Sequence, residues 1–104
     1  MLDKLKAIND RFEEVERLIS SPDAMNDMKL YVKLNKEYKE LGPIVTAYHE
    51  YKDIISNITS SKAILKEDDL EMKEMAKMEL DELLPRKEEM DEEIKILLIP
   101  TDPE

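Results

Sequence analysis

Residues 2–19 read LDKLKAINDRFEEVERLI, and the apolar residues in this stretch recur every three or four positions. They are Leu2, Leu5, Ile8, Phe12, Val15 and Leu18. Residues at that spacing share one face of an α-helix, so the stretch predicts an amphipathic helix over roughly residues 2–20. Pro22 disfavours helical backbone at Ser21, so we expect this helix to end at a turn in the run Ser20-Ser21-Pro22-Asp23.

A second, longer helix is predicted from Asn26 or Asp27, either of which can cap it, to about residue 65. Its apolar face comprises Met28, Tyr31, Leu34, Tyr38, Leu41, Ile44, Tyr48, Tyr51, Ile55, Ile58 and Leu65. Pro43 lacks the amide hydrogen that would bond to the carbonyl of Lys39, so we expect a kink or a break near Pro43. The apolar spacing passes Pro43 without a slip, which favours one bent helix over two separate helices.

A third helix is predicted from a cap at Asp68 or Asp69 to Pro100. Its apolar positions follow the four-three rhythm of coiled coils, with Lys87 in one of the apolar slots. These positions are Met72, Ala76, Leu80, Leu83, Met90, Ile94 and Leu97. Pro85 lies inside this span, so a second kink is expected there.

The composition fits an all-α domain of three long antiparallel helices, arranged as a bundle or a coiled-coil-like domain. Gly42 is the only glycine among 104 residues, which leaves little material for hairpin turns and disfavours all-β and α/β folds. The chain has no cysteine, no secretory signal and no apolar run of the roughly 20 residues that span a membrane. We expect a soluble cytoplasmic domain over residues 1–99, followed by the start of a truncated linker at residues 100–104.

The sequence contains no residues arranged for catalysis, metal binding or cofactor binding. His49 is the only histidine, so neither a catalytic triad nor a di-iron site can be assembled. Acidic runs such as Asp68-Asp69 fall between the apolar positions and are therefore expected to face water. A single glycine cannot build a phosphate-binding loop. We therefore expect no catalytic residues, no metal and no cofactor, and a role in binding.

The net charge of −10 is unevenly distributed. Residues 1–65 hold 11 acidic and 10 basic residues, whereas residues 66–104 hold 15 acidic and 6 basic residues. A field of this sign repels phosphate, which disfavours nucleic-acid binding by the whole chain. One basic stripe lies at helical spacing in the first part: Lys29, Lys33, Lys36 and Lys39. Composition alone favours a solubilising face, partly neutralised by Glu37 and Glu40, and the alternative is contact with a phosphate backbone.

Three of the seven methionines, Met72, Met75 and Met78, lie close together in the sequence. Methionines usually fill a core, which is the interpretation that we favour. Met75 and Met78 fall off the predicted apolar face, however, and are candidates for an adaptable binding groove.

Several segments, in order along the chain, carry a resemblance to a known family. They are Leu2-Asp3-Lys4-Leu5, residues 11–16, residues 34–45, residues 71–76 and Ile96-Leu97-Leu98-Ile99-Pro100-Thr101-Asp102-Pro103. Together they resemble the N-terminal domain of bacterial class I peptide chain release factors. Residues 96–103 are similar to a passage of the factors that read UAA and UAG.

This resemblance implies a full-length protein that recognises stop codons on the ribosome and promotes hydrolysis of peptidyl-tRNA. It also implies a helical domain near the stalk base of the large ribosomal subunit, which makes the lysine stripe a candidate contact with ribosomal RNA. Two further partners are implied: the class II release-factor GTPase and the release-factor glutamine methyltransferase. The alternative is a free-standing helical adaptor or a coiled-coil homodimer, and a weak homodimer of the domain is a related expectation.

Overall fold

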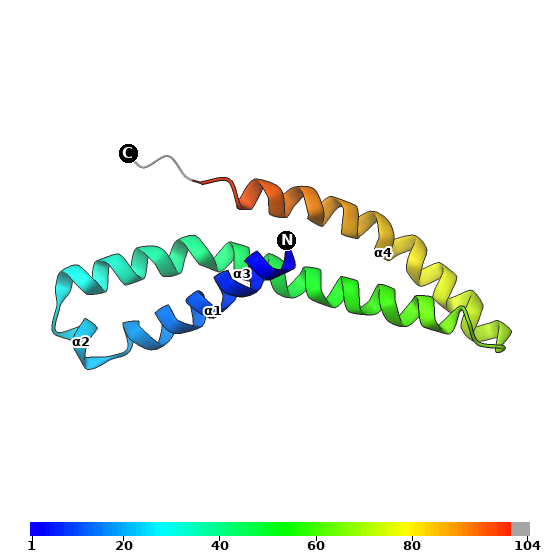
Figure 1. Cartoon of the computed structure of the whole chain (residues 1–104), viewed down its shortest axis with the longest axis horizontal. Helices are drawn as coiled ribbons and strands as arrows, with labels where there is room; N and C mark the ends of the chain where they lie inside the picture. The colour runs from blue at the N-terminus through cyan, green and yellow to red at the C-terminus, as the bar shows by residue number, and fades with distance from the viewer. Residues whose placement is uncertain (101–104) are drawn as a thin grey trace. The chain divides into compact units, whose positions relative to one another are not determined.

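The computed structural model describes residues 1–100 and contains four helices and no strand within them (Figure 1). The helices are α1 (Leu2–Ile19), α2 (Pro22–Met25), α3 (Met28–Ile64) and α4 (Leu70–Leu97). The predicted all-α fold is confirmed, and the three long helices are α1, α3 and α4. Apart from Pro100, the predicted linker at residues 100–104 lies outside the described residues.

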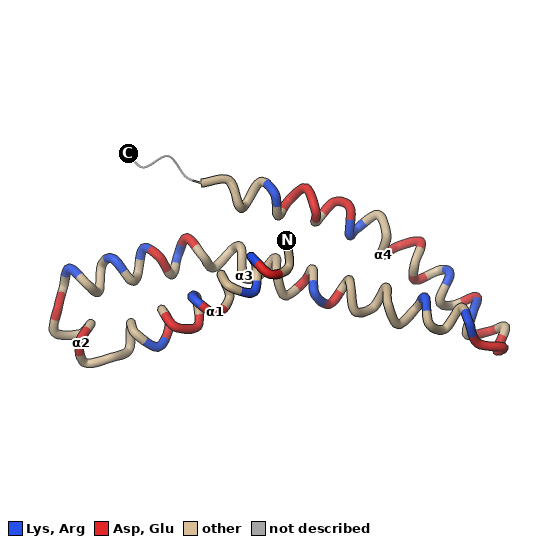
Figure 2. The backbone as a smooth tube through the Cα atoms, in the orientation of Figure 1, with Lys and Arg blue, Asp and Glu red and all other residues tan. Residues whose placement is uncertain are grey.

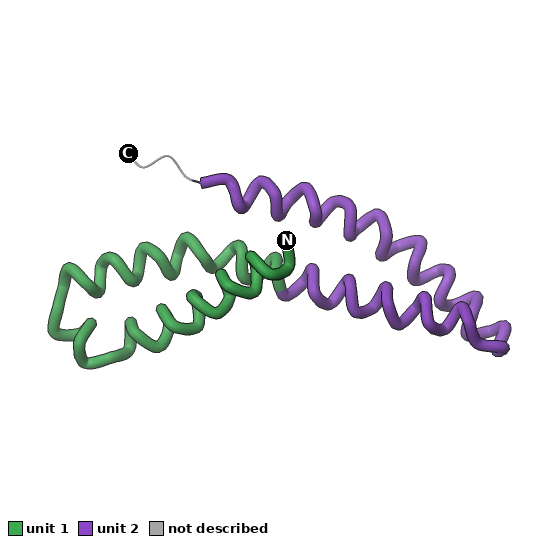
Figure 3. Tube along the Cα trace, in the orientation of Figure 1, with its two compact units in different colours: residues 1–48 green, residues 49–104 purple. Residues whose placement is uncertain are grey.

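The chain divides into two compact units, and the boundary falls within α3 (Figure 3). The first unit, Met1–Tyr48, contains α1, α2 and the first part of α3. The second unit begins at His49 and contains the rest of α3 together with α4.

The short helix α2 corrects the sequence analysis, which predicted only a turn at residues 20–23. Ser21 caps α2, because its side chain accepts a hydrogen bond from the amide of Ala24. Pro22 occupies the first turn of α2, where an amide hydrogen would have no partner within the helix. The same Ser-Pro pair that ends α1 therefore starts a new helix, and residues 1–100 form four helices instead of three.

One cluster in the core of the first unit takes a buried side chain from each of the three helices. Val15 of α1, Ala24 of α2 and Leu34 of α3 are buried together, and Ile19, Leu30 and Tyr38 pack against them. The ring of Tyr38 also stacks on Phe12, with 4.7 Å between the ring centroids. Helix α2 therefore supplies a small residue that closes the core between α1 and α3.

Helix α3 begins at a cap and continues through its internal proline. Asp27 accepts a hydrogen bond from the amide of Leu30 at 3.2 Å, so the structure selects Asp27 over Asn26 as the cap. The helix passes Pro43 without a break, as the unbroken apolar spacing indicated. Val45 and Tyr48, in the turns that follow, are buried, and this burial offsets the hydrogen bond lost at Pro43. The kink at Pro43 stays a prediction.

In the second unit, α4 runs antiparallel to the second part of α3. Asp69 caps α4, since its side chain accepts a hydrogen bond from the amide of Met72 at 3.2 Å. The helix passes Pro85 without a break, and its ribbon curves along its length (Figure 1). The buried face of the unit consists of Tyr51, Ile54, Ile58 and Ser61 from α3 and Ala76, Leu80, Met90 and Ile94 from α4.

Several positions depart from the predicted stripes of this unit. Met72 and Leu97, which were predicted on the apolar face of the third helix, are 42% and 36% exposed. Ile54 is buried where the sequence analysis placed Ile55, which is half-buried. Ser61 is buried although it is polar, and its hydroxyl donates a hydrogen bond to Glu79 at 3.1 Å. That bond satisfies the hydroxyl and links the two helices near their connecting loop.

Candidate nucleic-acid interface

The four residues of the lysine stripe lie on the first part of α3 (Figure 2). Spacings of four, three and three place them on one side of the helix, over about 15 Å of its length. All four are exposed, whereas Leu34 of the same helix is buried in the core of the first unit. The lysine stripe is therefore a solvent-facing surface on a helix whose opposite side is anchored. The stripe comprises Lys29, Lys33, Lys36 and Lys39.

Glu37, one of the two acidic residues expected to neutralise this stripe, is engaged elsewhere. The guanidinium of Arg11, on α1, donates to both carboxylate oxygens of Glu37, at 2.6 Å and 2.8 Å. These hydrogen bonds hold the pKa of Glu37 below its usual value despite the opposing effect of burial, and Lys33 adds a smaller electrostatic contribution. Arg11 also pairs with Glu14. The Glu37 carboxylate is therefore held by an α1 side chain and is turned away from close pairing with the lysines.

Within residues 1–100, none of the four lysines forms an ion pair closer than 4 Å. Glu40 is exposed and lies on the same side of α3, so it offsets part of the positive charge. The stripe keeps a net positive charge and hydrated ammonium groups. Ammonium groups on flexible stems suit contact with phosphates along a backbone.

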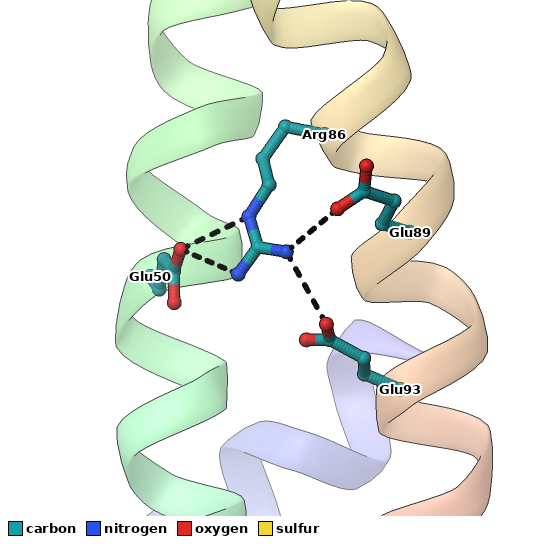
Figure 4. Close-up of polar contacts among 4 residues, drawn as sticks. All are labelled: Glu50, Arg86, Glu89 and Glu93. Atoms are coloured by element: carbon teal, nitrogen blue, oxygen red, sulfur yellow. Dashed lines mark hydrogen bonds and ion pairs between the residues drawn. The ribbon is translucent and has the colours of Figure 1, made fainter.

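A different cation, Arg86 on α4, is fully occupied by carboxylates (Figure 4). Its guanidinium lies 2.9 Å from Glu50 of α3, 3.0 Å from Glu89 and 3.2 Å from Glu93. These hydrogen bonds raise the pKa of Arg86, which stays charged. Three carboxylates around one guanidinium leave the cluster negative, so it links α3 to α4 and does not bind anions.

The structure also explains why Lys87 occupies an apolar slot of α4. Its Nζ lies 5.6 Å from the centre of the Tyr51 ring and 3.1 Å from the Asp91 carboxylate. The Tyr51 hydroxyl donates to the same carboxylate. Hydrogen bonding from Tyr51, with a further contribution from Lys87, lowers the pKa of Asp91 against the effect of burial. The Lys87 ammonium group therefore lies over the ring and is paired with Asp91 at the same time.

The described residues contain no arrangement that suggests other chemistry. Among them, no three His, Cys, Asp or Glu side chains are placed to hold a metal ion. None of the four helices is both long enough and apolar enough to cross a membrane. The exposed lysine stripe is therefore the surface with the clearest capacity to bind a ligand of opposite charge.

An all-helical fold with an exposed basic stripe that is only partly offset by Glu40 is typical of a helical binding module. Comparison with known protein families shows to which family this binding module belongs. Residues 8–104 match the PCRF domain, and the chain belongs to the peptide chain release factor family.

Relatives from several bacteria match along nearly the whole chain. The chain is 53% identical over 104 residues to "Peptide chain release factor 1" of Cytophaga hutchinsonii, a match that covers 99% of this chain and 29% of the relative. The protein of the same name from Brevibacillus brevis is 47% identical, with the same coverage. That from Bacteroides fragilis is 48% identical over 105 residues, covering 100% of this chain and 28% of the relative. The chain thus spans less than a third of the length of these relatives, and no solved structure matches it.

Proposed function

We propose that this chain is the ribosome-binding helical domain of a factor that terminates translation at UAA and UAG codons. The proposal is supported by the relatives, which are named peptide chain release factor 1, and by the resemblance of residues 96–103 to the factors that read these codons. Stop-codon recognition and peptidyl-tRNA hydrolysis are activities of the whole factor. The domain contributes binding.

The main observation that supports ribosome binding is the lysine stripe. On a chain of net charge −10, four exposed lysines without ion-paired partners lie on one side of a helix that a buried core holds in place. Phosphate contacts of this kind position a protein on RNA without reading its sequence. We assign the lysine stripe to contact with ribosomal RNA at the stalk base of the large subunit, the location that the family resemblance implies.

A substitution series tests the RNA contact. All four stripe lysines are changed to glutamine in the full-length factor, and affinity for the ribosome is measured over a range of salt concentrations. Each phosphate contact that is lost should lower the salt-dependence slope by roughly one unit, and affinity at low salt should fall at least about tenfold. Glutamine has a helix propensity close to that of lysine, so α3 should remain folded.

A matched control removes the same charge elsewhere. It changes Lys62, Lys66, Lys73 and Lys77, which lie in the second unit, to glutamine. The control should keep the slope of the parent protein. If the stripe variant also keeps it, the stripe is only a solubilising face; equal losses in both variants would show general charge attraction instead of a defined contact.

The same resemblance extends the proposal to a cytoplasmic location and to two protein partners, the class II release-factor GTPase and the release-factor glutamine methyltransferase. A weak homodimer of the domain is a separate proposal. Sedimentation equilibrium of the 104-residue chain over a range of concentrations tests it, and a constant monomer mass would contradict it.

A further inference from the structure

Two methionines of α4 lie on its outer face, away from the buried face of the second unit. Met75 and Met78 are each 69% exposed, whereas Ala76 and Leu80, on either side of Met78 in the sequence, are buried. Successive residues of an α-helix are separated by about 100°, so Met78 projects nearly opposite Ala76. The interpretation that these methionines fill the core is therefore wrong, and the sequence-based alternative of a binding surface remains.

Acidic residues surround this methionine pair. Positions three, four and seven residues from Met78 are its neighbours on the helix surface; besides Met75 and Pro85, the other four of these six positions are exposed carboxylates. They are Glu71, Glu74, Asp81 and Glu82. We refer to Met75, Met78 and these four residues as the methionine–acid face.

The negative charge of the methionine–acid face is largely uncompensated. Glu74 lies 3.9 Å from Lys77, at the limit of an ion pair, and within residues 1–100 none of the other three carboxylates has an ion pair. Farther along α4 the pattern is different: Arg86, Lys87 and Lys95 pair with the acidic residues near them. In the first half of α4, acidic residues with little or no ion pairing therefore coincide with the exposed methionines Met75 and Met78.

We propose that the methionine–acid face docks a basic amphipathic helix of a partner protein. Methionine side chains are flexible and polarisable, so they adapt to the apolar side chains of an incoming helix. The surrounding carboxylates select lysine or arginine residues that flank the apolar stripe of that helix. The same charges repel phosphate, which excludes RNA as the occupant. The proposal goes beyond ribosomal RNA binding, because it concerns another helix, a surface of opposite charge and a different class of partner.

The first unit contains a second pair of exposed methionines, which serves for comparison because acidic residues do not surround it. Met25 and Met28 are 74% and 75% exposed and line, with Ala24 and Tyr31, a shallow apolar pocket of about 240 Å³. The neighbours of Met28 in the sequence are Asp27 and Lys29, which have opposite charges. If exposed methionines alone attracted a helix, this surface would bind as well as the methionine–acid face.

The test uses the 104-residue chain labelled with ¹³C in its methionine methyl groups. The probe is a synthetic amphipathic helix of about 18 residues, or five turns, built only from leucine and lysine. We expect the methyl resonances of Met75 and Met78 to shift on titration and those of Met25 and Met28 to remain in place. A second peptide, with the same lysines but with glutamine in place of leucine, should bind at least about tenfold more weakly, because the methionines then have no apolar partner.

Variants separate the contributions of the two residue types. The methionine variant carries Met75→Gln and Met78→Gln, and the acid variant carries Glu71→Gln, Asp81→Asn and Glu82→Gln. Each variant should bind the leucine–lysine peptide about tenfold more weakly, or weaker still. The acid variant should also lose most of the salt dependence of binding. All these side chains are exposed, so circular dichroism should show an unchanged helix content. The matched control, Met25→Gln with Met28→Gln, should bind the peptide like the parent chain.

Three results would overturn the proposal. The first is equal shifts at the two methionine pairs, and the second is undiminished binding to the Met75→Gln, Met78→Gln variant. The third is a change of the Met75 and Met78 methyl resonances with protein concentration when no peptide is present. That result would mean that the methionine–acid face is a contact between two copies of this chain. None of these results bears on the lysine stripe, so the two proposals fail independently.

Discussion

Asp91 shows how a single side chain ties stability to pH. It accepts a hydrogen bond from Tyr51 and pairs with Lys87, and both interactions favour the charged carboxylate. The pKa of Asp91 is therefore lower in the folded chain than the value near 3.9 that is usual for an unfolded aspartate. A group of this kind stabilises the folded state above its unfolded pKa, and the contribution disappears as the pH falls through its folded pKa.

We predict that Asp91→Asn lowers the free energy of unfolding by about 1 kcal/mol at pH 7. The loss should shrink as the pH falls from about 5 to 2, because the parent carboxylate becomes protonated over that range. Urea unfolding of parent and variant at a series of pH values measures the difference. A difference that stays constant down to the lowest pH would show that the Asp91 charge contributes nothing to stability.

At the scale of a helix, capping distinguishes two adjacent aspartates that the sequence could not separate. Asp69 accepts the hydrogen bond from the amide of Met72 at the start of α4, and Asp68 precedes it as an exposed residue. We predict that Asp69→Ala lowers the free energy of unfolding by about 1 kcal/mol, whereas Asp68→Ala changes it by less than about 0.5 kcal/mol. Urea unfolding measures both, and equal effects would contradict the assignment of the cap.

The proline within α4 belongs to the same scale. Pro85 lies inside a continuous helix and is exposed, and it deprives the carbonyl of Asp81 of its helical hydrogen bond. We predict that Pro85→Ala raises the free energy of unfolding by about 1 to 3 kcal/mol. Pro22→Ala is the matched control, because Pro22 occupies the first turn of α2, where proline is favourable. The control should be neutral or slightly destabilising in the same urea experiment; stabilisation by both changes would mean that position within the helix is irrelevant.

At the scale of the whole molecule, the exposed basic stripe and the exposed methionine–acid face lie on different helices. The first part of α3 carries the lysine stripe, and α4 carries the methionine–acid face. Each surface is exposed because the opposite side of its helix is buried in the core of its own unit. The fold thus presents two chemically distinct exposed surfaces, one basic and one acidic with exposed methionines.

We predict that the 104-residue chain alone does not release peptide from ribosomes stalled at a stop codon. The resemblance to class I release factors implies that hydrolysis depends on a Gly-Gly-Gln tripeptide, and a sequence with one glycine cannot contain it. Release of labelled formyl-methionine from programmed ribosomes is the measurement, with a full-length relative as the positive control. Release above the buffer background that persists through further purification would contradict the prediction.

The sequence by itself determined the helical fold, because apolar residues at spacings of three and four can be buried together only on one side of a helix. It also determined that the lysine stripe shares one side of α3, since that follows from spacing alone. Residues 96–103 and the other family segments were sufficient to indicate the release factors, and the family comparison confirms this.

Only the tertiary structure decided which side chains meet across helices. Spacing cannot show that Ala24 completes a core with Val15 and Leu34, so α2 was missed. Nor can it show that Arg11, 26 residues away, holds Glu37 and leaves the lysines without it. Helical periodicity describes one element at a time, whereas pairing depends on which faces are packed together. Exposure of Met75 and Met78, and with it the methionine–acid face, likewise follows from where the core of the second unit lies.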